Sequence, residues 1–139
     1  MNARLVLLLS MLGLAMAFGT VFFIASNIAP FAWLAIFLVC AWLIATRAGS
    51  KPFRHGLAVG LLNSVWVTSA HILLFRQYAA SHPEEMEAMR SMPLAESPRL
   101  MMAITGPIIG LVTGVVLGVL ALGATKLVSR RPASPSPAN

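Results

Sequence analysis

Charged residues are scarce in this chain of 139 residues, of which they make up 10%, and only four of them are acidic. A soluble domain carries about 25% charged residues. Four long stretches hold no Asp, Glu, Lys or Arg, namely residues 5–26, 30–46, 56–75 and 100–125. A small proton-coupled exporter built from four helices needs a carboxylate within the membrane. The lack of one in these stretches argues against that class.

Cysteine is almost absent as well. Cys40 is the single one, so no intramolecular disulfide and no thiol pair for redox chemistry is expected. Of the three histidines, His55 is predicted on one side of a membrane and His71 and His82 on the other, so the three do not bind one metal ion together. No nucleophile stands at a recognisable spacing from a base. We therefore expect no enzymatic activity, no metal and no cofactor.

Apolar residues, by contrast, make up 58% of the chain, and the mean hydropathy is +0.84. A chain of this length cannot bury so much apolar surface away from water, so lipid is its expected solvent. At about 1.5 Å per residue, the four uncharged stretches are long enough to cross a hydrocarbon core of about 30 Å. The sequence predicts an all-α polytopic membrane protein, an antiparallel bundle of four transmembrane helices over residues 1–128.

The segments between the apolar stretches differ in length. Asn27 to Pro30 is a tight turn, which makes the first two helices an antiparallel hairpin. Segment 76–99 is long, and its proline and methionine spacing predicts an outer loop with a short amphipathic helix near residues 83–91. Residues 129–139 are rich in Pro and Ser, which predicts a disordered cytoplasmic tail.

The basic residues predict the orientation. With Arg4 in the cytoplasm, seven of the ten Lys and Arg lie inside and three outside, as the positive-inside rule requires. The inner set is Arg4, Arg47, Lys51, Arg54, Lys126, Arg130 and Arg131, and the outer set is Arg76, Arg90 and Arg99. We expect a multi-pass protein of the cell inner membrane with both termini cytoplasmic. Basic residues so dispersed form no footprint for nucleic acid.

The first apolar stretch has a second interpretation. Arg4, the apolar run and Ala15-Met16-Ala17 imitate a signal peptide with its cleavage site, and cleavage would leave three spans. The run continues through Val21 and Ile24, however, which exceeds the apolar core of a typical signal peptide. A membrane span is the favoured interpretation.

Glycines recur at every fourth position of the last apolar stretch, at Gly106, Gly110, Gly114 and Gly118. This glycine-zipper pattern places backbone without side chains on one helix face, where another helix can approach closely. Such a face serves packing within the chain, an interface between copies, or a wall beside a pore. Packing within the chain is the favoured interpretation.

The third apolar stretch carries most of the polar side chains. Gly60, Ser64, Thr68 and His71 share a narrow sector of the helix, with Asn63 at its edge. One hypothesis is a polar pathway or pocket lined by Asn63, Ser64, Thr68 and His71. The other, which is favoured, has Gly60 and Ser64 packing against the glycine face of the last helix, with hydrogen bonds across the helix pair.

Three features of residues 51–128 stand together. They are the run Phe53-Arg54-His55-Gly56-Leu57-Ala58-Val59-Gly60, the loop motif Pro83-Glu84-Glu85-Met86, and the glycine-rich stretch before Lys126. In these features the chain resembles an uncharacterised family of small bacterial four-helix membrane proteins of unknown function. The resemblance implies the four-helix architecture and no activity.

The sequence therefore predicts a non-catalytic inner-membrane protein, either structural or an accessory subunit of another membrane protein. The alternative is a homo-oligomeric channel or small transporter that uses the polar face of the third helix. The expected partners are the lipid bilayer and either further copies of the chain or another membrane protein.

Overall fold

The computed structural model describes residues 1–129, and that part of the chain contains helices and no strands. Six helices follow one another along the sequence. They are α1 (Ala3–Phe22), α2 (Ala29–Arg47), α3 (Pro52–Leu73), α4 (Phe75–Ser81), α5 (Pro83–Arg90) and α6 (Pro98–Ser129). The prediction of an all-helical chain with four long apolar helices is confirmed. The tail predicted over 129–139 lies, from residue 130 onward, outside the described residues.

Local chemistry accounts for the helix ends. The Asn2 side chain accepts a hydrogen bond from the backbone N–H of Leu5 and so caps α1. At the other end, the N–H groups of Phe23 and Ile24 both donate to the carbonyl of Gly19, at 2.8 and 2.7 Å. These bonds end α1 at Phe22, four residues before Ser26, where the uncharged stretch ends.

The loop between α2 and α3 depends on left-handed backbone. Gly49 has φ +66°, which glycine adopts without a steric penalty. Lys51 has φ 57° and immediately precedes Pro52, the first residue of α3. Proline suits that position because the first helical N–H has no partner within the helix. The chain therefore reverses direction within a few residues.

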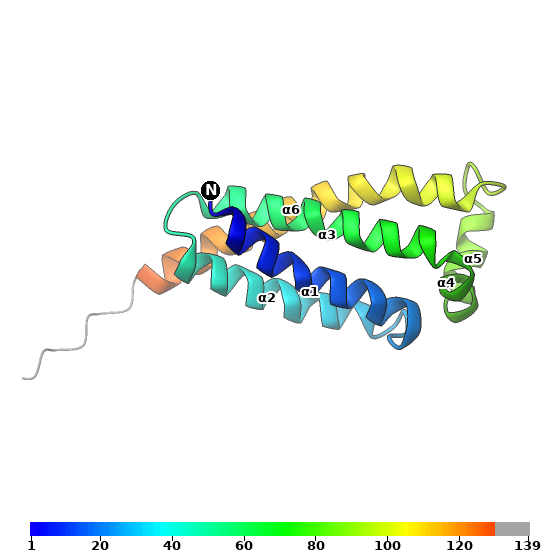
Figure 1. Ribbon diagram of the computed structural model, residues 1–139, viewed down its shortest axis with the longest axis horizontal. Coiled ribbons are helices and arrows are strands. Elements are labelled where there is room, and N and C mark those ends of the chain that lie inside the picture. Colours follow the sequence, from blue (N-terminus) through cyan, green and yellow to red (C-terminus); the bar gives the residue numbers. More distant parts are fainter. Residues whose placement is uncertain (130–139) are drawn as a thin grey trace, which may run out of the picture.

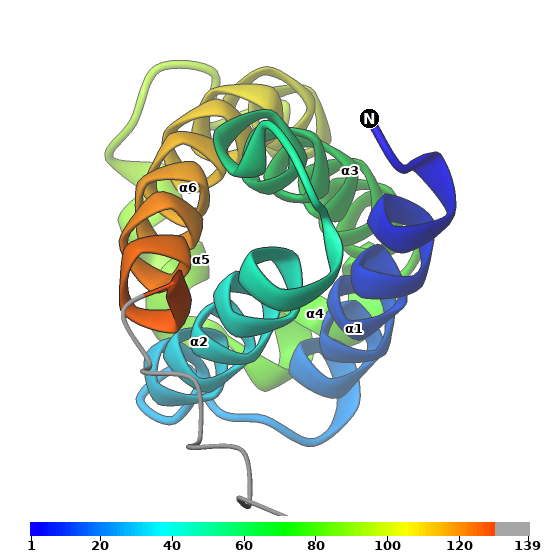
Figure 2. The same cartoon turned by 90° about the vertical axis from the view of Figure 1, so that its left-hand side faces the viewer.

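The four long helices run back and forth along the long axis of the molecule, and α4 and α5 lie across one end (Figure 1). Seen along that axis, their order around the molecule is α1, α3, α6 and α2 (Figure 2). The α3–α6 pair has the most extensive contact, followed by α1–α3 and α2–α6. Below, the end that carries α4 and α5 is called the α4–α5 end.

Glycines make the α3–α6 contact close. A Cβ atom placed on Gly56 would lie 2.6 Å from Cα of Gly118, and one on Gly60 would overlap the backbone of Gly114. In the next two turns of the helix pair, Gly110 lies against the side chain of Ser64 and Gly106 lies against that of Thr68. Backbone on both sides of this contact leaves no room for larger residues.

Two apolar clusters hold the helices together. The larger joins all four long helices in the half of the molecule away from α4 and α5, and its buried members are Leu5, Val6, Leu9, Cys40, Ala41, Ile44, Val59, Leu117 and Ala121. The smaller, at the α4–α5 end, consists of Val21, Tyr78 and Met102, with Met86 and Met89 packed against it. Helix α2 contributes no residue to this smaller cluster.

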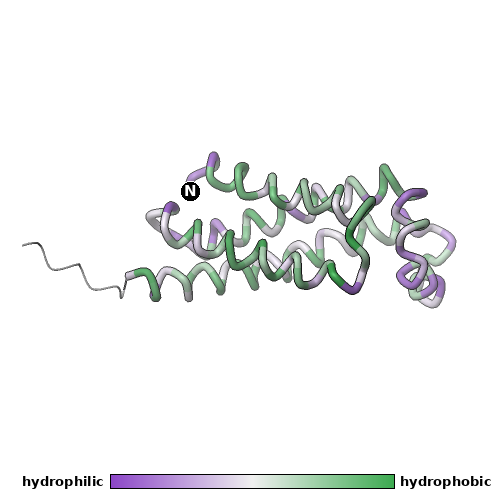
Figure 3. The backbone as a smooth tube through the Cα atoms, turned by 90° about the horizontal axis from the view of Figure 1, so that it is seen from below, coloured by the Kyte–Doolittle hydropathy of each residue, from purple (hydrophilic) through white to green (hydrophobic). Residues whose placement is uncertain are grey.

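Many apolar side chains point outward. On α2 they include Phe31, Leu34, Leu38, Val39 and Trp42, and on α6 they include Ile104, Ile108, Leu111, Val112, Val115 and Val119. Figure 3 shows hydrophilic residues gathered mainly at the two ends of the molecule, with hydrophobic residues along the helices between them. Four helices, α1, α2, α3 and α6, are long and apolar enough to cross a membrane.

Segment 76–99 differs from the single short helix that the sequence predicts. It holds most of α4 as well as α5, because the chain breaks at Leu74 and turns across the end of the bundle. Ser81 does not cap α5. Its hydroxyl instead donates to the carbonyl of Val21, at 2.8 Å, and so ties α4 to the end of α1.

Candidate functional site

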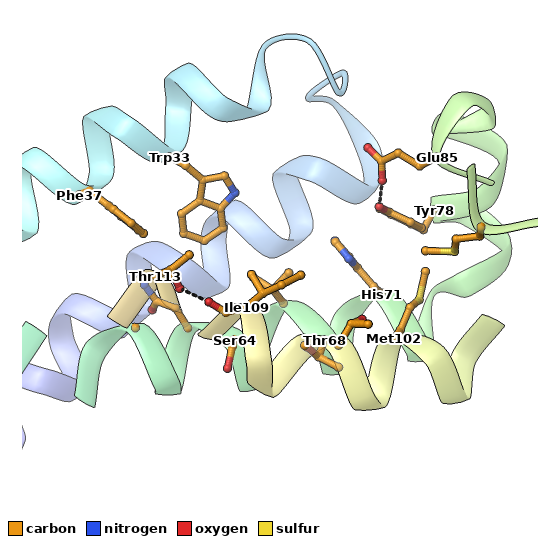
Figure 4. Close-up of a pocket in the computed structure, with 16 residues that line it drawn as sticks. Trp33, Phe37, Ser64, Thr68, His71, Tyr78, Glu85, Met102, Ile109 and Thr113 are labelled. Carbon is orange, nitrogen blue, oxygen red and sulfur yellow. Dashed lines mark hydrogen bonds between the residues drawn. The ribbon is translucent and has the colours of Figure 1, made fainter. Parts of the chain in front are cut away.

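A pocket of about 500 Å³ lies between α2, α3 and α6, and α4 and α5 form its roof. Pockets that hold small molecules measure about 300–1,000 Å³. Figure 4 shows Trp33 and Phe37 projecting from α2 toward side chains of α3 and α6. The lining is Trp33, Phe37, Gly60, Asn63, Ser64, Val67, Thr68, His71, Tyr78, Glu85, Met89, Met102, Thr105, Gly106, Ile109 and Thr113.

All four residues of the predicted polar pathway, Asn63, Ser64, Thr68 and His71, line this pocket. Two of them also belong to the helix contact, since the side chains of Ser64 and Thr68 lie against Gly110 and Gly106. The Ser64 hydroxyl donates to the carbonyl of Leu61, at 2.8 Å. Of the predicted packing set, Gly60 and Gly106 reach the pocket as well. The polar strip of α3 therefore both packs against α6 and borders a cavity.

Asn63 stands out within the strip. Its side chain is only 4% exposed, and neither amide atom has a hydrogen-bond partner among residues 1–129. One side of the amide rests on Gly13 of α1, where any Cβ would collide with it. A buried amide without a partner costs about 1–3 kcal/mol. Both amide atoms are inaccessible, and the amide packs against α1, which does not line the pocket, so this cost falls on the stability of the folded protein.

Three aromatic rings are stacked at the α4–α5 end. The ring of Tyr78 lies between those of His71 and His82, with centroid distances of 4.1 and 4.4 Å. His71 Nε2 lies 3.1 Å from the hydroxyl of Thr20, which itself donates to the carbonyl of Ala17. The stack and this contact join α3, α4 and α1 at the α4–α5 end of the pocket.

Glu85 reaches this stack from α5. One carboxylate oxygen accepts from the hydroxyl of Ser26, at 2.7 Å, and the other accepts from the hydroxyl of Tyr78. Burial, together with the hydrogen bond to Glu85, raises the pKa of Tyr78 well above its usual value near 10. The phenol is therefore a stable donor. Figure 4 shows Glu85 and Tyr78 side by side at the pocket.

The negative charge of Glu85 has no cationic partner in the part of the chain that the structure describes. There the single ion pair joins Arg90 to Glu87 on the exposed side of α5, at 2.8 Å. Glu85 itself is half-buried. A carboxylate so placed, with only neutral donors around it, gives the α4–α5 end of the pocket a negative potential.

The pocket is closed at one end and open at one side. Beyond Gly60 the larger apolar cluster fills the space, with Val59 and Leu117 fully buried. At the side, Ile109 of α6 is 59% exposed although it lines the pocket. Helices α2 and α6 diverge toward the α4–α5 end (Figure 1). The exposed Ile109 indicates that the pocket opens at the side of the molecule along α6. A molecule would enter sideways rather than along the helices.

Sequence reasoning missed the ten other lining residues, which are Trp33, Phe37, Val67, Tyr78, Glu85, Met89, Met102, Thr105, Ile109 and Thr113. The spacing of Glu85 and Met89, four apart on α5, is a usable signal, since it puts an acid and an apolar residue on one helix face. Nothing in the sequence indicates, however, that this face folds back over α3.

No protein-family model matches this chain, and neither a curated protein nor a solved structure matches it. The resemblance of residues 51–128 to a bacterial membrane family therefore stays a prediction. The function has to be inferred from the geometry of the pocket.

Proposed function

We propose that the chain is an integral protein of the cell inner membrane, with α1, α2, α3 and α6 crossing as an antiparallel bundle. Two observations support this. Large apolar side chains cover the outward faces of α2 and α6, a surface that lipid solvates and water does not. Charged residues stand at or beyond the ends of the long helices, where headgroups and water begin. With α4 and α5 outside, both termini are cytoplasmic.

Within that membrane protein we propose a non-catalytic role, the binding of a small and largely apolar molecule in the pocket between α2, α3 and α6. The observation that carries the proposal is the cavity itself, which measures about 500 Å³ and is lined by apolar and aromatic side chains with a few polar ones among them. The lateral opening fits a ligand that arrives from the bilayer. An accessory subunit that holds such a molecule for another membrane protein is consistent with this role.

The rival function, a channel or transporter along the polar face of α3, fits this geometry less well. Conduction needs a path from one end of the bundle to the other. The polar strip ends near Gly60, where Val59 and Leu117 are fully buried in the larger apolar cluster. A closed pocket supports binding over conduction.

Tryptophan fluorescence tests the binding role. Trp33 lines the pocket, whereas Trp42 lies on the same helix and is 55% exposed. In a variant that keeps only Trp33 (Trp42→Phe, Trp66→Phe), reconstituted in lipid nanodiscs, 11-bromoundecanol should quench saturably because it fills a finite site. In the matched variant that keeps only Trp42 (Trp33→Phe, Trp66→Phe), quenching should rise in proportion to the alcohol dissolved in the lipid. Equal, unsaturable quenching of both would contradict the proposal.

A further inference from the structure

Resting on the binding role proposed above, we infer that the pocket takes a lipophilic cation. Its quaternary ammonium centre lies at the α4–α5 end beside Glu85, and its apolar chain extends toward the closed end of the pocket. Two features of the lining support this class of ligand: an uncompensated charge and an aromatic wall.

The charge comes from Glu85. Its oxygens accept from Ser26 and Tyr78, two neutral hydroxyls that disperse the negative charge without cancelling it. A carboxylate in apolar surroundings is stabilised when a cation comes close, because the cation replaces the solvation lost on burial. An anionic ligand, such as a fatty acid, would meet repulsion at the same place.

The walls suit a quaternary ammonium in particular. Trp33 lines the pocket and is the aromatic contact for the ammonium, since His71 and His82 cover both faces of the Tyr78 ring. Aromatic faces attract such cations through the ring quadrupole, by about 2 kcal/mol or more when the site is desolvated. A quaternary ammonium donates no hydrogen bond, so it needs no further acceptor beyond the charge of Glu85.

Arg99 does not neutralise Glu85 in place of a ligand. Arg99, at the start of α6, stacks over the ring of Phe75 with 4.9 Å between its Cζ atom and the ring centroid. Neither Arg99 nor Phe75 lines the pocket. His71 and His82 flank Tyr78 on either side of its ring, and neither hydrogen-bonds to Glu85.

The length of the pocket sets the length of the ligand. Eight residues of helix, about 12 Å, separate Asn63 from His71 at the α4–α5 end, and both residues line the pocket. The ligand is therefore elongated, with the cation at one end of an apolar chain.

Competition against 11-bromoundecanol in the Trp33-only protein tests this inference. The competitors share an 11-hydroxyundecyl chain and differ only in the head group, which is trimethylammonium, hydroxyl or carboxylate. The ammonium compound should bind about tenfold or more tightly than the diol, and the carboxylate more weakly than the diol. In Glu85→Gln the affinity for the ammonium compound should fall to that for the diol. The adjacent, exposed Glu84→Gln is the matched control and should change nothing.

The outcomes separate the two proposals. If the three head groups compete equally, the cation inference is wrong while the pocket remains a binding site. If neither the alcohol nor its competitors saturate, both proposals fail. An equal loss of affinity for the ammonium compound in Glu84→Gln and Glu85→Gln would show that the effect comes from general surface charge, and it would overturn the inference. Should Glu85→Gln not fold, the ranking of head groups on the unsubstituted pocket decides the matter.

Discussion

At the scale of single residues, Asn63 and Glu85 are both polar groups whose burial is not fully compensated by the surrounding protein. Functional sites commonly retain such groups because a ligand completes their interactions. Glu85 lines the pocket, where a ligand can do so, whereas the amide of Asn63 is packed against α1 and only lowers stability.

Asn63→Leu should make the protein more stable. Leucine has nearly the branching of asparagine, so it fits beside Gly13, and it removes two polar atoms that lack partners. We expect a gain of about 1–3 kcal/mol in the free energy of unfolding. Thermal melting in detergent measures the effect. A less stable Asn63→Leu would mean that the amide is satisfied in the folded protein.

At the scale of helices, the α3–α6 pair forms the rigid part of the structure. Gly56 and Gly60 of α3 face Gly118 and Gly114 of α6 with backbone against backbone. Dispersion contacts of this kind do not depend on water, so they hold helices together in lipid as well. Helix α2 contributes fewer buried residues and has a largely exposed surface.

Gly60→Ala should destabilise the pair by about 1–3 kcal/mol, because the added methyl meets the backbone of Gly114, which cannot move aside. Gly123→Ala is the matched control, since nothing lies within 4 Å of a Cβ at that position of α6. It should leave stability unchanged or raise it slightly through helix propensity. Melting temperatures of the two variants in one detergent provide the comparison, and equal values would disprove a close α3–α6 contact.

The elements could be predicted from the sequence to the extent that they depend on local pattern. The uncharged stretches indicate four long helices, and glycine spacing indicates a close helix contact. The roof over the pocket could not be predicted, because it depends on Ser81 bonding to Val21 and on Glu85 reaching Ser26, contacts 60 and 59 residues apart. Periodicity along the chain carries no information on such distant pairs.

At the scale of the whole molecule, the distribution of polar residues predicts how the bundle sits in a membrane. Figure 3 shows the hydrophilic ends that headgroups would cover. An alkaline phosphatase reporter, which is active only outside the cytoplasm, should be active when fused after Asn27 or after Ser91. It should be inactive after Ser129. Activity in the reverse pattern would invert the orientation, and activity at all three positions would contradict four crossings.

The close glycine contact has a consequence for ligand selectivity. Because α3 and α6 cannot separate, the length available between Asn63 and Tyr78 is fixed by one rigid unit. The opposite wall belongs to α2, whose anchoring residues Cys40, Ala41 and Ile44 all lie beyond the closed end of the pocket. The part of α2 that lines the pocket can therefore move outward. The site should discriminate strongly between ligands of different length and weakly between ligands of different width.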